Sequence, residues 1–253
     1  MRIYADESGT HGGDWLIIGM LFVPDHGQLH SDLCAAKEKA QYFNKGSRKA
    51  RYKEIHFADL KSSRDAEVSE AWIDCFLSSG AVFRSVVVEW AIWEGRYFGG
   101  PFEPDALKKR RAYKKWAEML LQPEVGALTN AQFYLDKLRI LYGYDVILGL
   151  KERFQHNEYG EVLSRPRIKE FQATESWKDA NQCLQLGDLL TGCVYQTLVP
   201  STNPAKLRVM NYLYKKLEAH GVKGRAPGYW RGFGSGVRKH FTKFSEWFWK
   251  PTD

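Results

Sequence analysis

Short strand-like segments alternate with helical segments along this chain, and their order limits the folds that it can adopt. Two strands come first, separated by the turn-forming pair Gly12-Gly13, which predicts a β-hairpin. Each later strand is separated from the next by one or more helices. This order predicts a mixed sheet with helices packed on its faces, an α/β layered domain. The expected strands are 2–6, 14–23, 81–90, 131–136 and 167–173, and the expected helices are 28–43, 65–79, 105–121, 144–155, 177–198 and 204–221.

The length of 253 residues fits one large domain or one domain with insertions. We expect residues 1–200 to form the main domain, and 201–253 to add a helix and a basic, aromatic-rich extension packed on it. The four cysteines show no Cys-x-x-Cys spacing, which argues against a zinc knuckle and points to a reducing compartment. The chain opens without an apolar leader, and its longest apolar run is too short to cross a bilayer. These features predict a cytoplasmic protein with no membrane contact.

The formal net charge of +7 and the sequence pI of about 9.1 favour a polyanionic partner, with nucleic acid as the first candidate. Basic clusters occur at 45–53, 108–115 and 223–243, and the last of them mixes cations with aromatic residues and glycines. That mixture suits a nucleic-acid strand. The alternatives are a solvated helix face at 108–115 and a tail that packs its aromatics on the core. The candidate nucleic-acid contacts are Lys108, Lys109, Arg110, Arg225, Arg231 and Arg238.

Two of the expected strands end in the same way, with an apolar-Tyr-apolar-Asp sequence that finishes at Asp6 in one and at Asp136 in the other. Side chains alternate faces along a strand, so each Asp shares a face with the preceding tyrosine, Tyr4 or Tyr134. If the strands are parallel neighbours, both acids lie at the same sheet edge, where sites of open α/β sheets gather. Either Asp alone is typical of a strand that ends in a turn. The matched pair favours a shared site.

A third acid, Asp188, lies among leucines and glycines in the expected helix 177–198. Gln185 and Gly192 fall on the same helical stripe as this Asp. An acid in such a setting carries a desolvation cost, and glycine would let the helix approach the sheet or a substrate closely. The alternative is a buried Asp that accepts a hydrogen bond from a nearby backbone amide. We interpret Asp188 as a site residue and Gln185 as an accessory one.

The fourth candidate acid is Glu54, which shares a face with His56 if the segment around them is extended. The alternative is an exposed edge strand. Glu7 and Ser8 directly follow Asp6, and Glu7 should point to the opposite face of the strand. We therefore treat His56, Glu7 and Ser8 as accessory to the acids.

Acids on four separate segments match what a pair of divalent ions requires. Mg²⁺ prefers oxygen ligands and keeps several waters, and Mn²⁺ accepts the same ligands. Two such ions about 4 Å apart stabilise the attacking and leaving oxygens of phosphodiester hydrolysis. The expected ligands of two Mg²⁺ or Mn²⁺ ions are Asp6, Glu54, Asp136 and Asp188.

These motifs resemble the bacterial domain-of-unknown-function family 3800. Asp-Glu-Ser-Gly at 6–9 is similar to the start of that family, and Glu-Ile-His-Phe at 54–57 to its Glu-x-His-Phe element. Residues 134–136 and 185–190 are similar to its third and fourth motifs. The family resembles the ribonuclease H-like superfamily. That implies a mixed five-stranded sheet with helices on both faces, and metal-bound acids on the first strand, the fourth strand and the last helix.

Two features depart from that pattern. Residues 28–52 form a helical insertion relative to a minimal ribonuclease H, and Glu54 lies in a strand-like or loop-like segment where the superfamily carries its Glu on a helix. The sequence predicts a metal-dependent nuclease. The alternatives are a non-catalytic module that binds nucleic acid or protein on the same fold, and a hydrolase of small phosphorylated nucleotides.

Overall fold

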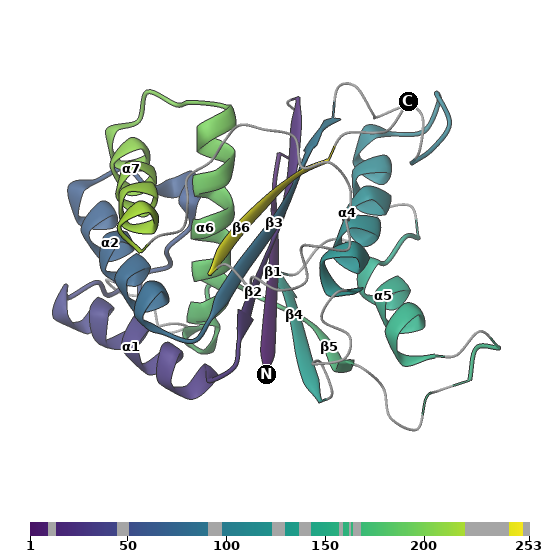
Figure 1. Cartoon of the computed structure of the whole chain (residues 1–253), viewed down its shortest axis with the longest axis horizontal. Coiled ribbons are helices and arrows are strands. Elements are labelled where there is room, and N and C mark those ends of the chain that lie inside the picture. The colour runs from purple at the N-terminus through teal and green to yellow at the C-terminus, as the bar shows by residue number, and fades with distance from the viewer. Residues whose placement is uncertain are drawn as a thin grey trace.

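The computed structural model describes residues 1–9, 14–44, 51–90, 98–122, 130–136, 143–156, 159–161, 163, 168–220 and 243–249. A mixed six-stranded sheet with the order β5-β4-β1-β2-β3-β6 forms its centre, as Figure 1 shows. β1 pairs with β2 and β2 with β3 in antiparallel fashion, whereas the pairs β1–β4, β4–β5 and β3–β6 are parallel. The strands are β1 (Arg2–Ser8), β2 (Trp15–Val23), β3 (Val82–Glu89), β4 (Ala131–Asp136), β5 (Ile168–Thr174) and β6 (Phe244–Trp249).

Helices cover both faces of the sheet (Figure 1). One face carries α1 (His26–Lys39), α2 (Ser63–Ser78), α6 (Gln182–Leu198) and α7 (Pro204–Ala219), and the other carries α4 (Asp105–Leu121) and α5 (Val146–Gln155). Two short 3-10 helices, η1 (Phe57–Asp59) and η3 (Asp179–Asn181), lie near the start of α2 and α6. The predicted α/β layering is therefore confirmed. Among the described residues, no helix has the length and apolar character that a membrane span needs.

The expectation of five strands is wrong, because β6 extends the sheet. Its residues come from the tail, where the sequence shows no clean alternation of apolar and polar side chains. β6 pairs with β3 from Phe83↔Phe244 onward, and these two rings stack with centroids 4.9 Å apart. Tyr214 of α7 donates a 2.5 Å hydrogen bond to the buried Glu246 of β6. Part of the predicted C-terminal extension is thus an integral strand of the domain.

The sheet separates two apolar cores. Alternate residues of β1 point to opposite faces, so Tyr4 joins the core under α6, while Ile3 and Ala5 join the core under α4. Burial of this apolar surface is the main favourable term in folding. The same alternation places Asp6 on the α6 face and Glu7 on the α4 face.

The predicted insertion, 28–52, is an integrated part of the α6 face. The N-cap of its helix α1 is Asp25, whose carboxylate accepts a hydrogen bond from the backbone N–H of Gln28. The helix packs on α2 and α6, and the indole of Trp72 in α2 donates to the carbonyl of Leu33 at 2.9 Å. The segment therefore contributes to the layer that covers β1 and the acids.

α6 lies against η1 in a contact that only glycine allows. A Cβ built on Gly192 would stand 2.2 Å from the ring of Phe57, far inside van der Waals contact. The expected close approach at this glycine is made to η1, not to the sheet or a substrate as predicted. The approach holds η1 beside the middle of α6, next to Asp188.

Candidate functional site

Asp6 and Asp136 lie on neighbouring parallel strands; Asp136 ends β4 as predicted, whereas β1 continues two residues beyond Asp6, to Ser8. The register pairs Tyr4 with Tyr134, and their rings stack with centroids 5.2 Å apart on the α6 face. Each Asp stands two residues beyond its tyrosine and therefore on the same face. Asp6 is only 9% exposed, whereas Asp136 is half-buried. The parity of the two strand ends thus brings the two acids to one edge of the sheet.

Asp188 of α6 faces Asp6 across the sheet–helix interface. The negative charge of Asp188 disfavours ionisation of Asp6. Burial raises the pKa of Asp6 well above its ordinary value, and the nearby Asp188, Glu7 and Asp136 raise it further. Oδ2 of Asp6 is buried without a hydrogen-bond partner. A buried orphan oxygen among acids is a costly arrangement that a bound cation would relieve.

The other contacts of Asp188 come from η1 and the residue before it. Its Oδ2 accepts a 2.6 Å hydrogen bond from the backbone N–H of Phe57. The Nε2 of His56 lies 3.6 Å from its Oδ1. Oδ2 therefore fits the alternative expectation for Asp188, that of an Asp that accepts a hydrogen bond from a backbone amide. The other oxygen faces a half-exposed histidine.

Ser176 connects Glu54 to Asp136, which the sequence reasoning missed. Its hydroxyl donates to Glu54 Oε1 at 2.5 Å, and its backbone N–H donates to Asp136 Oδ1 at 3.2 Å. Ser176 follows the carboxyl end of β5, the strand next to β4. The signal in the sequence was its place just after a strand, at the edge where sites gather. Glu54 lies outside regular secondary structure, as its strand-like or loop-like prediction allowed.

Gln185 of α6 holds three neighbours of the acids. Its Oε1 accepts hydrogen bonds from the Ile55 N–H at 3.0 Å and from the Lys37 Nζ at 2.9 Å. Its Nε2 donates to the carbonyl of Ser176 at 2.6 Å. Lys37 also donates to the carbonyl of Lys53 at 2.7 Å, and burial lowers the pKa of Lys37 to about 7. Gln185, the predicted accessory residue, therefore lies behind Glu54 and not among the acids.

Glu7 points to the opposite face of β1, as expected, and meets α4 there. Its Oε1 lies 3.2 Å from the guanidinium of Arg110, and its other oxygen is buried without a hydrogen-bond partner. Burial raises the pKa of Glu7 to about 7, although Arg110 lowers it. Ser8 is half-buried in the ladder opposite Ile17, and within the described residues it makes no hydrogen bond to the acids.

The expected nucleic-acid contacts on α4 require a correction. Lys108 and Lys109 are 6% and 3% exposed, so they do not form the solvated face that the charge cluster indicated. The ammonium of Lys109 donates to the carbonyl of Gly9 and pairs with Asp105. A long basic side chain can be buried next to the end of a strand when carbonyls and carboxylates there accept hydrogen bonds from its charged end. Arg225, Arg231 and Arg238 lie outside the described residues.

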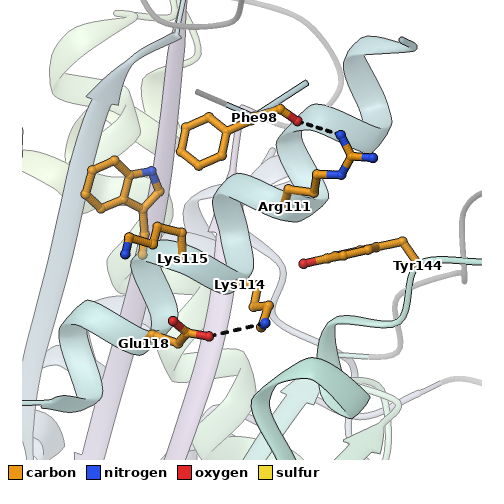
Figure 2. Close-up of a pocket in the computed structure, with 7 residues that line it drawn as sticks. Phe98, Arg111, Lys114, Lys115, Glu118 and Tyr144 are labelled. Carbon is orange, nitrogen blue, oxygen red and sulfur yellow. Dashed lines mark hydrogen bonds and ion pairs between the residues drawn. The ribbon is translucent and has the colours of Figure 1, made fainter. Parts of the chain in front are cut away.

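A cavity of about 410 Å³ lies beside α4, and Figure 2 shows its lining. Arg111 in its wall donates to both oxygens of Glu103 and to the carbonyl of Phe98, and Lys114 pairs with Glu118. The acids Asp6 and Asp188 belong to the other face of the sheet, and the charges of this wall largely neutralise each other. We therefore place the candidate site at the acids. The lining residues are Phe98, Arg111, Lys114, Lys115, Trp116, Glu118 and Tyr144.

The donor chemistry at the acids fits a hard divalent cation, since all four proposed ligands offer carboxylate oxygens. Their present positions are not those of a formed metal site. In the described part of the chain, no three His, Cys, Asp or Glu side chains are grouped so that they could hold one ion. Asp6 and Asp188 repel each other when both are ionised, and a bound cation would offset that repulsion.

No family model, no curated protein and no solved structure matches this chain. What these side chains do must therefore follow from their own geometry and chemistry. Three acids, a half-exposed histidine and a network built on Ser176 and Gln185 meet Glu54 at the carboxyl ends of β1 and β4.

Proposed function

We propose that this protein hydrolyses phosphodiester bonds of nucleic acids, with two Mg²⁺ or Mn²⁺ ions held by Asp6, Glu54, Asp136 and Asp188. The proposal rests on one observation. Acids from four separate segments lie around the carboxyl ends of β1 and β4, where burial and neighbouring acids disfavour ionisation of Asp6 and its Oδ2 has no hydrogen-bond partner.

The electrostatics of the cluster support a cation at this place. Asp188, Glu7 and Asp136 all disfavour ionisation of Asp6, so ionised acids here would repel one another. Like charges held close in a protein are typical of functional sites. Bound divalent ions would supply Lewis acidity for the phosphoryl oxygens and lower the pKa of an attacking water. In this chain, Asp6 and Asp188 would hold that charge, and Ser176 would orient Glu54 toward Asp136.

The arrangement of the acids on the sheet supports a ribonuclease H-like fold. Asp6 lies on the first strand, Asp136 on the fourth strand and Asp188 on α6, as the resemblance to the family 3800 implies. The five strands β5-β4-β1-β2-β3 form a mixed sheet with helices on both faces, to which β6 is added. Fold alone does not specify a reaction, so the acids carry the proposal.

A nucleic-acid substrate is supported by charge. The chain carries a formal net charge of +7 although it concentrates acids at the site. A basic protein attracts a polyanion over distance, and divalent ions offset the acids where the phosphate must approach. The half-exposed imidazole of His56, next to Asp188, stands where it can exchange protons with solvent.

Cleavage assays on single- and double-stranded RNA and DNA test the proposal. With Mg²⁺ or Mn²⁺ the wild type should cut at least one of these polymers, and Asp6→Asn and Asp188→Asn should each remove the activity while the fold is kept. Asp32→Asn makes the same chemical change at an exposed hydrogen bond on α1 and should remain active. Full activity in both site variants would refute the assignment. Binding of the polymers with no cleavage under any metal would favour the non-catalytic module.

A further inference from the structure

Among the described residues of the α6 face, Lys37 is the most deeply buried charged side chain. It belongs to α1, within the predicted insertion, and it is 0% exposed. Its Nζ lies 4.6 Å from the centroid of the Trp72 ring, a distance at which the ring face attracts a cation. Lysine is rarely fully buried unless its ammonium is paired or hydrogen-bonded. What it bonds to therefore indicates why a lysine stands here.

The hydrogen bonds of Lys37 reach one side of Glu54 directly and the other side through Gln185. One runs to the carbonyl of Lys53, the residue before Glu54, at 2.7 Å. The other runs to Gln185 Oε1 at 2.9 Å, and the same oxygen accepts the N–H of Ile55, the residue after Glu54, at 3.0 Å. One ammonium and one amide thus hold both backbone groups that flank this acid.

The same amide reaches the other partner of Glu54. Gln185 Nε2 donates to the carbonyl of Ser176, and the Ser176 hydroxyl donates to Glu54 Oε1. The backbone N–H of Ser176 contacts Asp136. Lys37 and Gln185 therefore fix Glu54 in two ways, through its own backbone and through the serine that places it opposite Asp136.

A core lysine that only fills space would not require this set of acceptors. The surroundings of Lys37 are aromatic, so an apolar side chain of similar length would pack there as well. These two hydrogen bonds go to neutral oxygens next to the candidate site and not to a carboxylate. Its polar end is thus directed to the segment that carries Glu54.

We propose that Lys37 is a positioning residue, which through Gln185 and the Lys53 carbonyl sets the place of Glu54 in the metal site. This inference rests on the proposed function. It also gives the helical insertion a role, since α1 carries this lysine and places its ammonium beside the site. Residues that orient metal ligands from behind commonly affect metal affinity about 10–100-fold.

The test is Lys37→Met, which keeps the length and apolar character of the side chain and removes the ammonium that donates both hydrogen bonds. Mn²⁺ affinity, measured by titration calorimetry well below the melting temperature, should fall about 10–100-fold. Hydrogen exchange should become faster in the peptide that contains Ile55, because its N–H loses the ordered amide acceptor, while the sheet strands exchange as before. Lys39→Met removes an exposed lysine from the same helix and should change neither quantity.

A double-mutant cycle separates positioning from general stability. If Lys37 acts through Glu54, then Lys37→Met combined with Glu54→Gln should bind Mn²⁺ no more weakly than the weaker single variant. Losses that multiply fully would overturn the proposal, as would wild-type affinity in Lys37→Met. If Lys37→Met does not fold, the neutral Lys37→Gln, which retains a polar end for this pocket, takes its place with the same expected non-additivity.

Failure of this inference can be told apart from failure of the proposed function. If Asp6→Asn weakens Mn²⁺ binding and Lys37→Met does not, the metal site stands and the positioning role falls. If Asp6→Asn and Asp188→Asn both leave Mn²⁺ binding unchanged, the metal site itself falls, and the positioning role falls with it.

Discussion

At the scale of single residues, Asp6 is defined by its neighbours of the same charge. It is nearly buried, one of its oxygens has no partner, and the acids around it all disfavour its ionised form. Such a residue lowers the stability of the metal-free protein, as active-site groups often do. The same features make it a good ligand, because a cation removes the repulsion that the fold otherwise has to bear.

Asp6→Asn should therefore stabilise the metal-free protein at pH 8. The amide cannot ionise, so it carries no charge for Asp188 to repel, and it can donate a hydrogen bond. Relief of about 1–2 kcal/mol corresponds to a rise in the melting temperature of roughly 2–8 °C for a chain of this size. Thermal unfolding with a chelator present measures the change. A melting temperature below that of the wild type would count against the description of Asp6 as a strained acid, and Asp32→Asn should show no shift.

Glu7 gives the metal-free protein a pH dependence of stability. Its pKa is raised from the ordinary 4.5 to about 7 in the folded protein, so the folded state holds its proton more tightly than the unfolded state. The stabilisation from this proton is complete below pH 4.5 and is lost as the pH rises to about 7.

Glu7→Gln should accordingly flatten the fall in stability between pH 4.5 and about 7. Glutamine has no proton to lose in this range, so the group stops contributing to the slope. Denaturant unfolding at several pH values, with a chelator present, measures that slope for both proteins. An unchanged slope would show that Glu7 titrates alike in the folded and unfolded states.

At the scale of elements, the site depends on how closely α6 approaches its neighbours. Gly192 lets the ring of Phe57 lie against the helix, and the N–H of Phe57 donates to Asp188. Gly187 lies one turn earlier on the same helix, yet a Cβ there would meet nothing nearer than 3.9 Å. The two glycines form a matched pair, one with a neighbour in the way and one without.

Gly192→Ala should destabilise the protein by about 1–3 kcal/mol, because the new methyl group must displace Phe57 and with it the η1 segment. Gly187→Ala should be neutral or stabilising by up to about 1 kcal/mol, since alanine favours the helix and has room. Unfolding in urea compares the two. Equal effects of both substitutions would contradict the close packing of η1 on α6.

Many of the elements and part of the site could be predicted from the sequence. Asp6 and Asp136 were paired by parity because side-chain alternation is a local rule, and Asp188 stood out because acids are rare among leucines. Ser176 and Lys37 were missed because nothing local marks them. Two of their hydrogen bonds, Lys37–Gln185 and Ser176–Glu54, join residues more than 100 positions apart and depend on how whole elements pack.

At the scale of the whole molecule, the C-terminal tail adds an edge strand, β6, to the sheet that starts in the N-terminal half. β6 pairs with β3 across about 160 residues of chain, and hydrogen bonds between such distant segments leave no local pattern to predict them. Its sequence, Phe-Ser-Glu-Trp-Phe-Trp, also lacks a simple apolar–polar alternation. The domain is therefore larger than the predicted five-stranded unit, and β6 lies at the edge far from the acids, next to β3.

The central claim is that four acids from separate elements form one metal site, and a titration with Mn²⁺ tests it most directly. Calorimetry in buffers of different ionisation enthalpy reports both the affinity and the protons released on binding. We predict that the wild type binds Mn²⁺ with proton release, and that Asp6→Asn, Asp136→Asn and Asp188→Asn each weaken binding at least tenfold while Asp32→Asn does not. Mn²⁺ binding that is absent in the wild type, or equal in all four variants, would contradict the claim.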